Sequence, residues 1–252
     1  MSARTVAWPE QQRSTPGFFG KLPTRGDFIS RVLPRSFLDP WDDWLQQAIA
    51  QSREQLAEHW LDCYLTSPIW RLILSPGSCG QQAYTGVLMP SMDRVGRYYP
   101  LLIAVPVHPA ASLLGLMEEG EPWYQEAEHI ALWGLEDDNL ELETFAERVQ
   151  ALGSPVGLTE QPDITPADGE GRLGWYCTLD HLDGLAGMRT ALSNELLPRS
   201  FPQYSLWWSQ GSEHIKPGLL ISPGLPAVEG FASLLAGDWR RWGWDEKQLH
   251  AK

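Results

Sequence analysis

The sequence predicts an α/β fold with a three-layer α-β-α arrangement, in which helices lie on both faces of a central sheet. Residues 99–107 are almost entirely apolar, which is typical of a strand that is buried on both faces. Other segments with strand character alternate with segments whose apolar residues recur at helical spacing. The short connections between strands favour antiparallel neighbours, so we expect a mixed, largely antiparallel sheet.

The elements can be placed along the chain by their patterns and by the turn residues that bound them. Strands are predicted at 17–22, 69–74, 84–89, 99–107, 174–179, 204–209 and 219–222. The clearest helix begins where Asp39 can cap it and Pro40 fits its first turn. It runs to Trp60 with one apolar face. Further helices are predicted at 112–117, 123–133, 140–152, 182–196 and from near Pro226 to Gly237.

The domain organisation is expected to be simple. Residues 1–15 are polar and read as a flexible tail, and residues 16–252 are expected to form a single domain. Residues 153–171 are rich in Gly, Pro and acidic side chains, so they predict a long loop and a possible sub-boundary. The 13 Trp residues are expected mainly in the core and at its rim, with partners for their N–H groups.

Charge is distributed unevenly along this chain of net charge -13. Residues 101–170 contain fifteen acidic side chains and Arg148 as their single cation. Such a surface repels phosphate backbones and anionic lipids, so neither nucleic-acid binding nor membrane insertion is expected. The region could attract a basic partner, or it could be a solvated acidic face.

The cysteines and the N-terminus indicate a compartment. The 3 Cys residues form no CxxC pair, and an odd number of free thiols suits a reducing environment. The first residues have no apolar signal-peptide core, and no stretch reaches the length of a membrane span. We therefore expect a cytoplasmic protein.

No catalytic, metal or cofactor motif is found in the sequence. The segment Gly17-x-x-Gly20-Lys21-Leu22 lacks the spacing and the Ser or Thr of a phosphate-binding loop. The histidines have no metal-ligand spacing, and Cys79 lies in a turn that is not a nucleophile elbow. We expect a protein that is not an enzyme; the alternative is a small hydrolase that uses Asp93 with a distant His or Cys79.

The most informative polar segment joins two strong strands. It holds Asp93, Arg94 and Arg97 around Gly96. Two arginines near a carboxylate can capture an anion, or Asp93 can pair with one of them inside a structural hairpin. Both interpretations remain open. Together with the loop after the first strand, this segment gives the candidate interaction residues Lys21, Arg25, Asp27, Asp93, Arg94 and Arg97.

Several segments together resemble the signature of the TagF (ImpM) family of type VI secretion system-associated proteins. They cover about residues 16–107 and are specific as a set. They read Gly17-Phe18-Phe19-Gly20-Lys21-Leu22-Pro23 with Arg25-Gly26-Asp27-Phe28, Phe37-Leu38-Asp39-Pro40-Trp41-Asp42-x-Trp44-Leu45, Ser67-Pro68-Ile69-Trp70-Arg71, and Gly86-Val87-Leu88-Met89-Pro90-Ser91-x-Asp93-x-Val95-Gly96-Arg97.

The resemblance implies a bacterial accessory protein that restrains the secretion apparatus after translation. It implies association with a forkhead-associated scaffold protein and with the threonine kinase and phosphatase pathway, and it supplies no catalytic residues. A phosphothreonine-sensing module that uses the Asp93–Arg97 loop is a further alternative. Neither the residues nor the resemblance indicates an oligomeric state.

Overall fold

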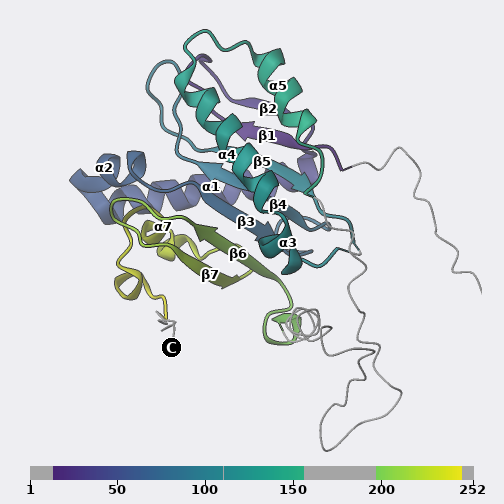
Figure 1. The fold of residues 1–252 in the computed structure, drawn as a ribbon. Coiled ribbons are helices and arrows are strands. Elements are labelled where there is room, and N and C mark those ends of the chain that lie inside the picture. Colours follow the sequence, from purple (N-terminus) through teal and green to yellow (C-terminus); the bar gives the residue numbers. More distant parts are fainter. Residues whose placement is uncertain (1–13, 110, 156–196, 246–252) are drawn as a thin grey trace, which may run out of the picture.

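A computed structural model describes residues 14–109, 111–155 and 197–245 (Figure 1). Seven strands of the described chain form one sheet in the order β2-β1-β5-β4-β3-β6-β7. Every pairing among them is antiparallel, so the parallel component of a mixed sheet is absent from this part of the chain. The strands are β1 (Gly17–Gly20), β2 (Ile29–Arg31), β3 (Trp70–Leu74), β4 (Tyr84–Met89), β5 (Leu101–Pro106), β6 (Tyr204–Ser209) and β7 (Gly218–Pro223).

Helices cover both faces of the sheet, which confirms the predicted three layers (Figure 1). One face carries α1 (Arg35–Leu56), η2 (Ala57–His59), α2 (Trp60–Leu65), η4 (Val228–Gly230), α7 (Ala232–Ala236) and η5 (Trp239–Trp242). The other carries α3 (Gly115–Glu119), α4 (Glu121–Glu136) and α5 (Leu142–Ala151). Residues 197–200 are also helical. None of the helices in the described ranges has the length and apolar character needed to cross a membrane.

Most of the described tryptophans lie in the core between α1 and the sheet or at its rim, although the buried Trp41 N–H has no hydrogen-bond partner in the described structure. Trp41 and Trp207 are fully buried, with ring centroids 6.2 Å apart. Trp44 and Trp70 donate their indole N–H groups to the carbonyls of Pro226 and Leu234, at 2.7 and 2.9 Å. These bonds attach the C-terminal segment to α1 and β3, which are distant in sequence.

The first helix begins earlier than the sequence predicts. It starts at Arg35 after Pro34, so Asp39 is not its cap and Pro40 lies within it. Proline inside a helix normally costs a hydrogen bond. The buried side chains of Phe37 and Leu38 explain why the extra turn forms, because that turn places both of them in the core.

A buried arginine attaches α4 to the centre of the sheet. Arg71 on β3 is only 2% exposed. Its guanidinium donates from Nε to Glu128 at 2.6 Å and from Nη1 to Glu121 at 2.5 Å. Two of the acidic side chains of region 101–170, Glu121 and Glu128, therefore pair with a buried cation. The other acidic side chains of α4 and α5 are exposed.

Other predicted elements were right in kind and differ at their ends. The strands at 84–89 and 204–209 have the predicted bounds. The predicted 17–22 strand ends at Gly20, and the helix predicted from Pro226 to Gly237 is split into η4 and α7. The short strand β2 was not predicted. The expected strand at 174–179, the expected helix at 182–196, and most of the predicted tail and of the 153–171 loop lie outside the described residues.

Candidate interaction site

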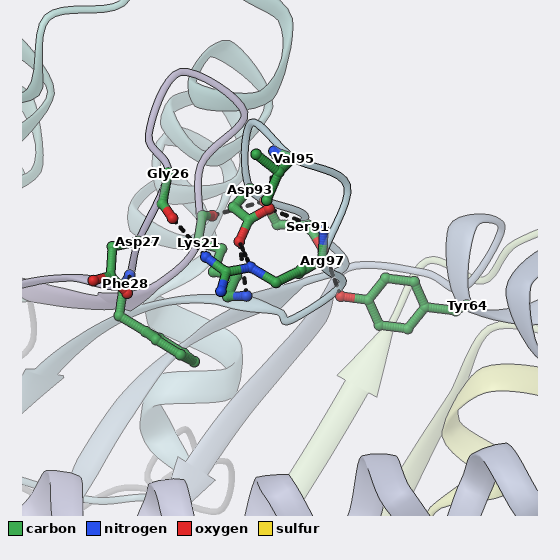
Figure 2. A network of polar contacts seen from close by, with 9 residues as sticks. All are labelled: Lys21, Gly26, Asp27, Phe28, Tyr64, Ser91, Asp93, Val95 and Arg97. Carbon is green, nitrogen blue, oxygen red and sulfur yellow. Dashed lines mark hydrogen bonds and ion pairs between the residues drawn. The ribbon is translucent and has the colours of Figure 1, made fainter.

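Two loops that are far apart in sequence meet at one end of the sheet (Figure 2). We define the paired loops as residues 21–28, between β1 and β2, and residues 90–98, between β4 and β5. They meet because β1 pairs with β5. The Arg94 backbone N–H donates to the Arg25 carbonyl at 2.8 Å, and Arg97 Nη2 donates to the Gly26 carbonyl at 2.6 Å.

Glycine makes this close approach possible. Gly20 ends β1 with a φ of +141°, and a Cβ there would lie 2.2 Å from the Pro100 carbonyl oxygen. No other residue fits so near to a neighbouring backbone. The Gly20-Lys21 step thereby brings Lys21 beside the chain that enters β5.

Asp93 is the centre of the polar network in Figure 2. One carboxylate oxygen accepts hydrogen bonds from Lys21 Nζ at 2.9 Å and from Arg97 Nε at 2.6 Å. The other accepts from the backbone N–H groups of Arg97 and Val95, at 2.9 and 3.1 Å. Asp93 is 2% exposed, so nearly every acceptor position is filled from within the protein.

These contacts keep Asp93 ionised. Burial alone would raise the pKa of its carboxyl group, because a charge is costly to remove from water. The hydrogen bonds from the Arg97 backbone, from Lys21, from the Arg97 guanidinium and from Val95 outweigh burial. They hold the pKa of Asp93 well below its ordinary range.

A second set of hydrogen bonds attaches the paired loops to the core. Ser91 donates its hydroxyl to the Lys21 carbonyl at 2.7 Å. The Tyr64 hydroxyl, which comes from α2, donates to the Ser91 carbonyl at 2.8 Å and accepts from its N–H at 3.0 Å. Burial raises the pKa of Tyr64, so its hydroxyl keeps the proton that it donates. The loops are therefore fixed to the helical layer as well as to each other.

An aromatic cluster supports the loops from the α1 face. Phe28 stacks on Phe19 with ring centroids 5.6 Å apart and meets Tyr99 edge-on at 4.8 Å. Lys21 Nζ lies 4.9 Å from the centroid of the Phe28 ring, within the range of a cation–π interaction. Lys21 thus contacts both a carboxylate and an aromatic face, which compensates for its burial.

The structure brings all six candidate residues into the paired loops but divides them into two groups. Lys21 and Asp93 are 5% and 2% exposed, so they hold the loops together and do not lie on the exposed surface, which corrects their prediction as contact residues. Asp27, Arg94 and Arg97 are exposed and Arg25 is half-buried. For these four, a role in binding stays a prediction.

The structural-hairpin interpretation of residues 90–98 also holds. The Asp93 N–H donates to the Arg97 carbonyl at 3.1 Å, and the Gly96 N–H donates to the Asp93 carbonyl at 2.9 Å. Asp93 pairs with Arg97, one of the two arginines proposed for it. Residues 90–98 therefore form a rigid hairpin whose tip, residues 94–97, is exposed and carries two arginines.

Sequence reasoning missed Tyr64 and Ser91. Ser91 stands two residues before Asp93, in the polar segment that the sequence marks as a candidate site, so its position could have indicated it. Tyr64 gave none, because its hydroxyl reaches the site from a helix 27 residues earlier in the chain.

Two residues of the hydrolase alternative, Cys79 and Asp93, are engaged in other contacts. Cys79 is buried, its Sγ donates to the Phe37 carbonyl at 3.3 Å, and burial raises the pKa of Cys79 to about 12. A thiol in such surroundings is a poor nucleophile. Asp93 is already fully hydrogen-bonded, so it is not free to orient a base. Among residues 14–109, 111–155 and 197–245, no cluster of His, Cys, Asp and Glu is placed to hold a metal ion.

The fold defines a three-layer α/β protein in which the paired loops form a buried polar network at one end of the sheet. Residues 17–152 match the model of the TagF N-terminal domain, a type VI secretion system-associated family. That range is more than half of the 252-residue chain, so the chain belongs to the TagF family. The association with type VI secretion follows from this membership, and the resemblance in the sequence is confirmed.

A solved structure extends the comparison beyond the matched domain. The chain is similar to PA0076 from Pseudomonas aeruginosa PAO1, with 34% sequence identity and a TM-score of 0.75. The similarity covers 94% of this chain and 99% of the solved chain. No curated protein matches this chain significantly.

Proposed function

We propose that this TagF-family chain is a non-catalytic cytoplasmic regulator that restrains a type VI secretion system after translation. It acts by binding a forkhead-associated scaffold component through the exposed part of the paired loops. Family membership supports the secretion role.

One observation carries the proposal: a buried ion pair fixes the backbone of the hairpin from which the exposed Arg94 projects. The Lys21–Asp93 pair and the Asp93–Arg97 contacts fix the backbone of the hairpin from inside. Arg94 and Val95 project from that backbone, and Val95 is 68% exposed. Arginine is enriched at protein interfaces, and a preorganised surface loses little conformational entropy on binding.

The non-catalytic part of the proposal rests on the state of the polar groups. The titratable groups buried in the paired loops are paired with each other, and the buried thiol of Cys79 is protonated. Groups that are satisfied in this way stabilise a structure and leave little capacity for proton transfer. We therefore place the partner contact on the exposed residues at the tip of the hairpin, Arg94, Val95 and Arg97.

The direct test is charge reversal at the tip. Arg94→Glu is suitable because no hydrogen bond or ion pair of its side chain is present in the described structure. Arg97 is less suitable, because reversing it would place a carboxylate against Asp93 and disturb the hairpin. We expect Arg94→Glu to reduce pull-down of the forkhead-associated component at least tenfold.

A matched control separates this effect from a change in net charge. Arg35→Glu makes the same change at a residue whose side chain is 90% exposed. Arg35 lies at the other end of the sheet from the paired loops, since α1 begins beside the β3–β4 turn. Arg35→Glu should leave pull-down within twofold of wild type. Equal pull-down by wild type and Arg94→Glu would show that the paired loops are not part of the interface.

A cellular assay tests the regulatory part. In a secretion-competent strain that lacks its own copy, wild-type chain should lower type VI secretion and Arg94→Glu should not. Thermal melting of the purified variants confirms that both are folded. If Arg94→Glu restrains secretion as fully as wild type does, the proposed mechanism is wrong even though family membership stands.

A further inference from the structure

The paired loops contain more positive charge than they use internally. They hold the cations Lys21, Arg25, Arg94 and Arg97 and the carboxylates Asp27 and Asp93. Asp93 is fully occupied by Lys21, Arg97 and two backbone N–H groups. Asp27 accepts a hydrogen bond from the Phe28 N–H at 2.8 Å. Within the described structure, Arg25 and Arg94 have no carboxylate oxygen within 4.0 Å.

Three guanidinium-bearing residues converge on one short stretch of backbone. The Arg94 N–H bonds to the Arg25 carbonyl and Arg97 Nη2 bonds to the Gly26 carbonyl. Arg94 Nη2 lies 3.5 Å from the position that a Cβ on Gly26 would occupy. The absence of a side chain at Gly26 leaves the Arg94 guanidinium room to lie over the loop. Asp93 already compensates the charge of Arg97, which leaves the charges of Arg25 and Arg94 on this stretch without a carboxylate partner in the described structure.

The loop around Arg25 also contains unsatisfied polar atoms. Thr24 Oγ1 and Arg25 Nε are buried and make no hydrogen bond with the rest of the described structure. Buried groups without partners are uncommon in native proteins, and each requires an explanation. Arg25 Nε is buried, so an oxyanion presented from outside would accept from the terminal nitrogens of the Arg25 guanidinium, in a charge-assisted hydrogen bond.

We propose that the exposed part of the paired loops is an oxyanion-binding site that takes a single carboxylate or phosphoryl group on a side chain of a partner protein. Arg25 and Arg94 bind the group, and Arg97 holds the hairpin in position through Asp93. This inference rests on the proposed function, because it specifies the chemistry that the same surface recognises.

The charge of the whole chain restricts the ligand further. The site is a small positive area on a protein of net charge -13. An extended polyanion would be repelled by the rest of the surface, whereas one locally presented oxyanion needs only the short-range contacts. Val95 stands between Arg94 and Arg97 in the sequence and is 68% exposed. An apolar side chain of the partner, next to its anionic group, could therefore pack against Val95.

Titration of the isotope-labelled full chain with three short peptides tests the inference by nuclear magnetic resonance. The peptides are identical except for phosphothreonine, glutamate or threonine at the central position. We expect the first two to shift the amide signals of residues 24–27 and 93–97 saturably, and the threonine peptide to leave them in place. A stronger effect of one charged peptide distinguishes a phosphoryl ligand from a carboxylate ligand.

Two substitutions complete the test. Arg94→Ala should weaken binding of the charged peptides at least fivefold, while Arg35→Ala should change it less than twofold. Equal shifts with the threonine peptide, or binding unaffected by Arg94→Ala, would overturn the inference. If the peptides do not bind but Arg94→Glu still abolishes scaffold pull-down, the oxyanion site is refuted and the proposed function is not. If the peptides bind but Arg94→Glu does not affect scaffold pull-down, the proposed function is refuted and the oxyanion site is supported.

Discussion

Lys21 Nζ lies 2.9 Å from Asp93 Oδ2 across 72 residues of sequence, and both side chains are almost completely buried. A buried ion pair contributes little net stability compared with a well-packed apolar pair. Removing one partner is costly, however, because the other charge stays buried without compensation. The pair therefore ties the β1–β2 loop to the β4–β5 loop, and loss of Asp93 leaves a buried ammonium group without its carboxylate.

The first prediction concerns this pair. Asp93→Ala removes the acceptor of both Lys21 and Arg97, so we expect the melting temperature to fall by roughly 10 °C. Lys21→Met should have a smaller effect, because Asp93 keeps Arg97 and two backbone donors. Differential scanning calorimetry of both variants measures this order. Asp27→Ala, on an exposed side chain in the same loops, is the control that should melt close to wild type.

The second prediction is a dependence of stability on acid. The pKa of Asp93 is lower in the folded protein than its ordinary value of 3.8, so the folded state favours the ionised form. The resulting stability is fully present above about pH 4 and is lost as the pH falls toward the folded pKa. The urea midpoints of wild type and Asp93→Asn, measured from pH 6 to pH 2, should therefore converge below pH 4. A constant difference over that range would contradict this prediction.

The third prediction concerns the buried arginine beneath α4. Arg71 contacts Glu128 through Nε and Nη2, at 2.6 and 3.1 Å, and Glu121 through Nη1. Lysine cannot reproduce this geometry with one nitrogen, so Arg71→Lys should lower the free energy of unfolding by about 2–3 kcal/mol. Arg31→Lys is the control, because its pair with Glu143 is exposed and such pairs contribute less than about 1 kcal/mol. Urea denaturation distinguishes the two variants, and equal losses would argue against a stabilising role of the contacts from Arg71 to Glu121 and Glu128.

The sequence predicted the layers well because burial leaves a strong pattern. Residues 101–105 are buried at every position, so an unbroken apolar run correctly indicated a strand covered on both faces. Strand β2 escaped prediction because it has only three residues, of which Ser30 and Arg31 are exposed. Its pairing with β1, and not its composition, makes it a strand.

The site was predicted at the level of loops and not of individual roles. The charges of residues 21–27 and 93–97 correctly marked the segments that meet. Sequence alone does not reveal that Lys21 is buried, since lysine is almost always exposed. Its burial depends on the antiparallel register of β1 and β5, which places Asp93 and the Phe28 ring beside it.

The last prediction concerns the backbone just before α1. Val32 has a φ of 71°, and the Leu33 N–H donates to the Arg31 carbonyl at 2.8 Å, which forms a three-residue turn. A β-branched residue rarely adopts such a conformation, because its Cβ then crowds the backbone. The Val32 side chain is 50% exposed, so packing recovers little of that strain.

Replacing Val32 by glycine should therefore stabilise the protein. The relief of about 1–2 kcal/mol exceeds the extra entropy cost of glycine, which leaves a gain of roughly 0.5–1 kcal/mol in the free energy of unfolding. Val95→Gly is the matched control, since Val95 is also exposed and is not among the described residues with positive φ. The free energy of unfolding of Val95→Gly should be lower than that of wild type by up to about 1 kcal/mol, because glycine at this position only adds conformational entropy to the unfolded chain. Urea midpoints of the two variants should thus move in opposite directions; a loss of stability in both would show that the Val32 turn carries no strain that glycine can relieve.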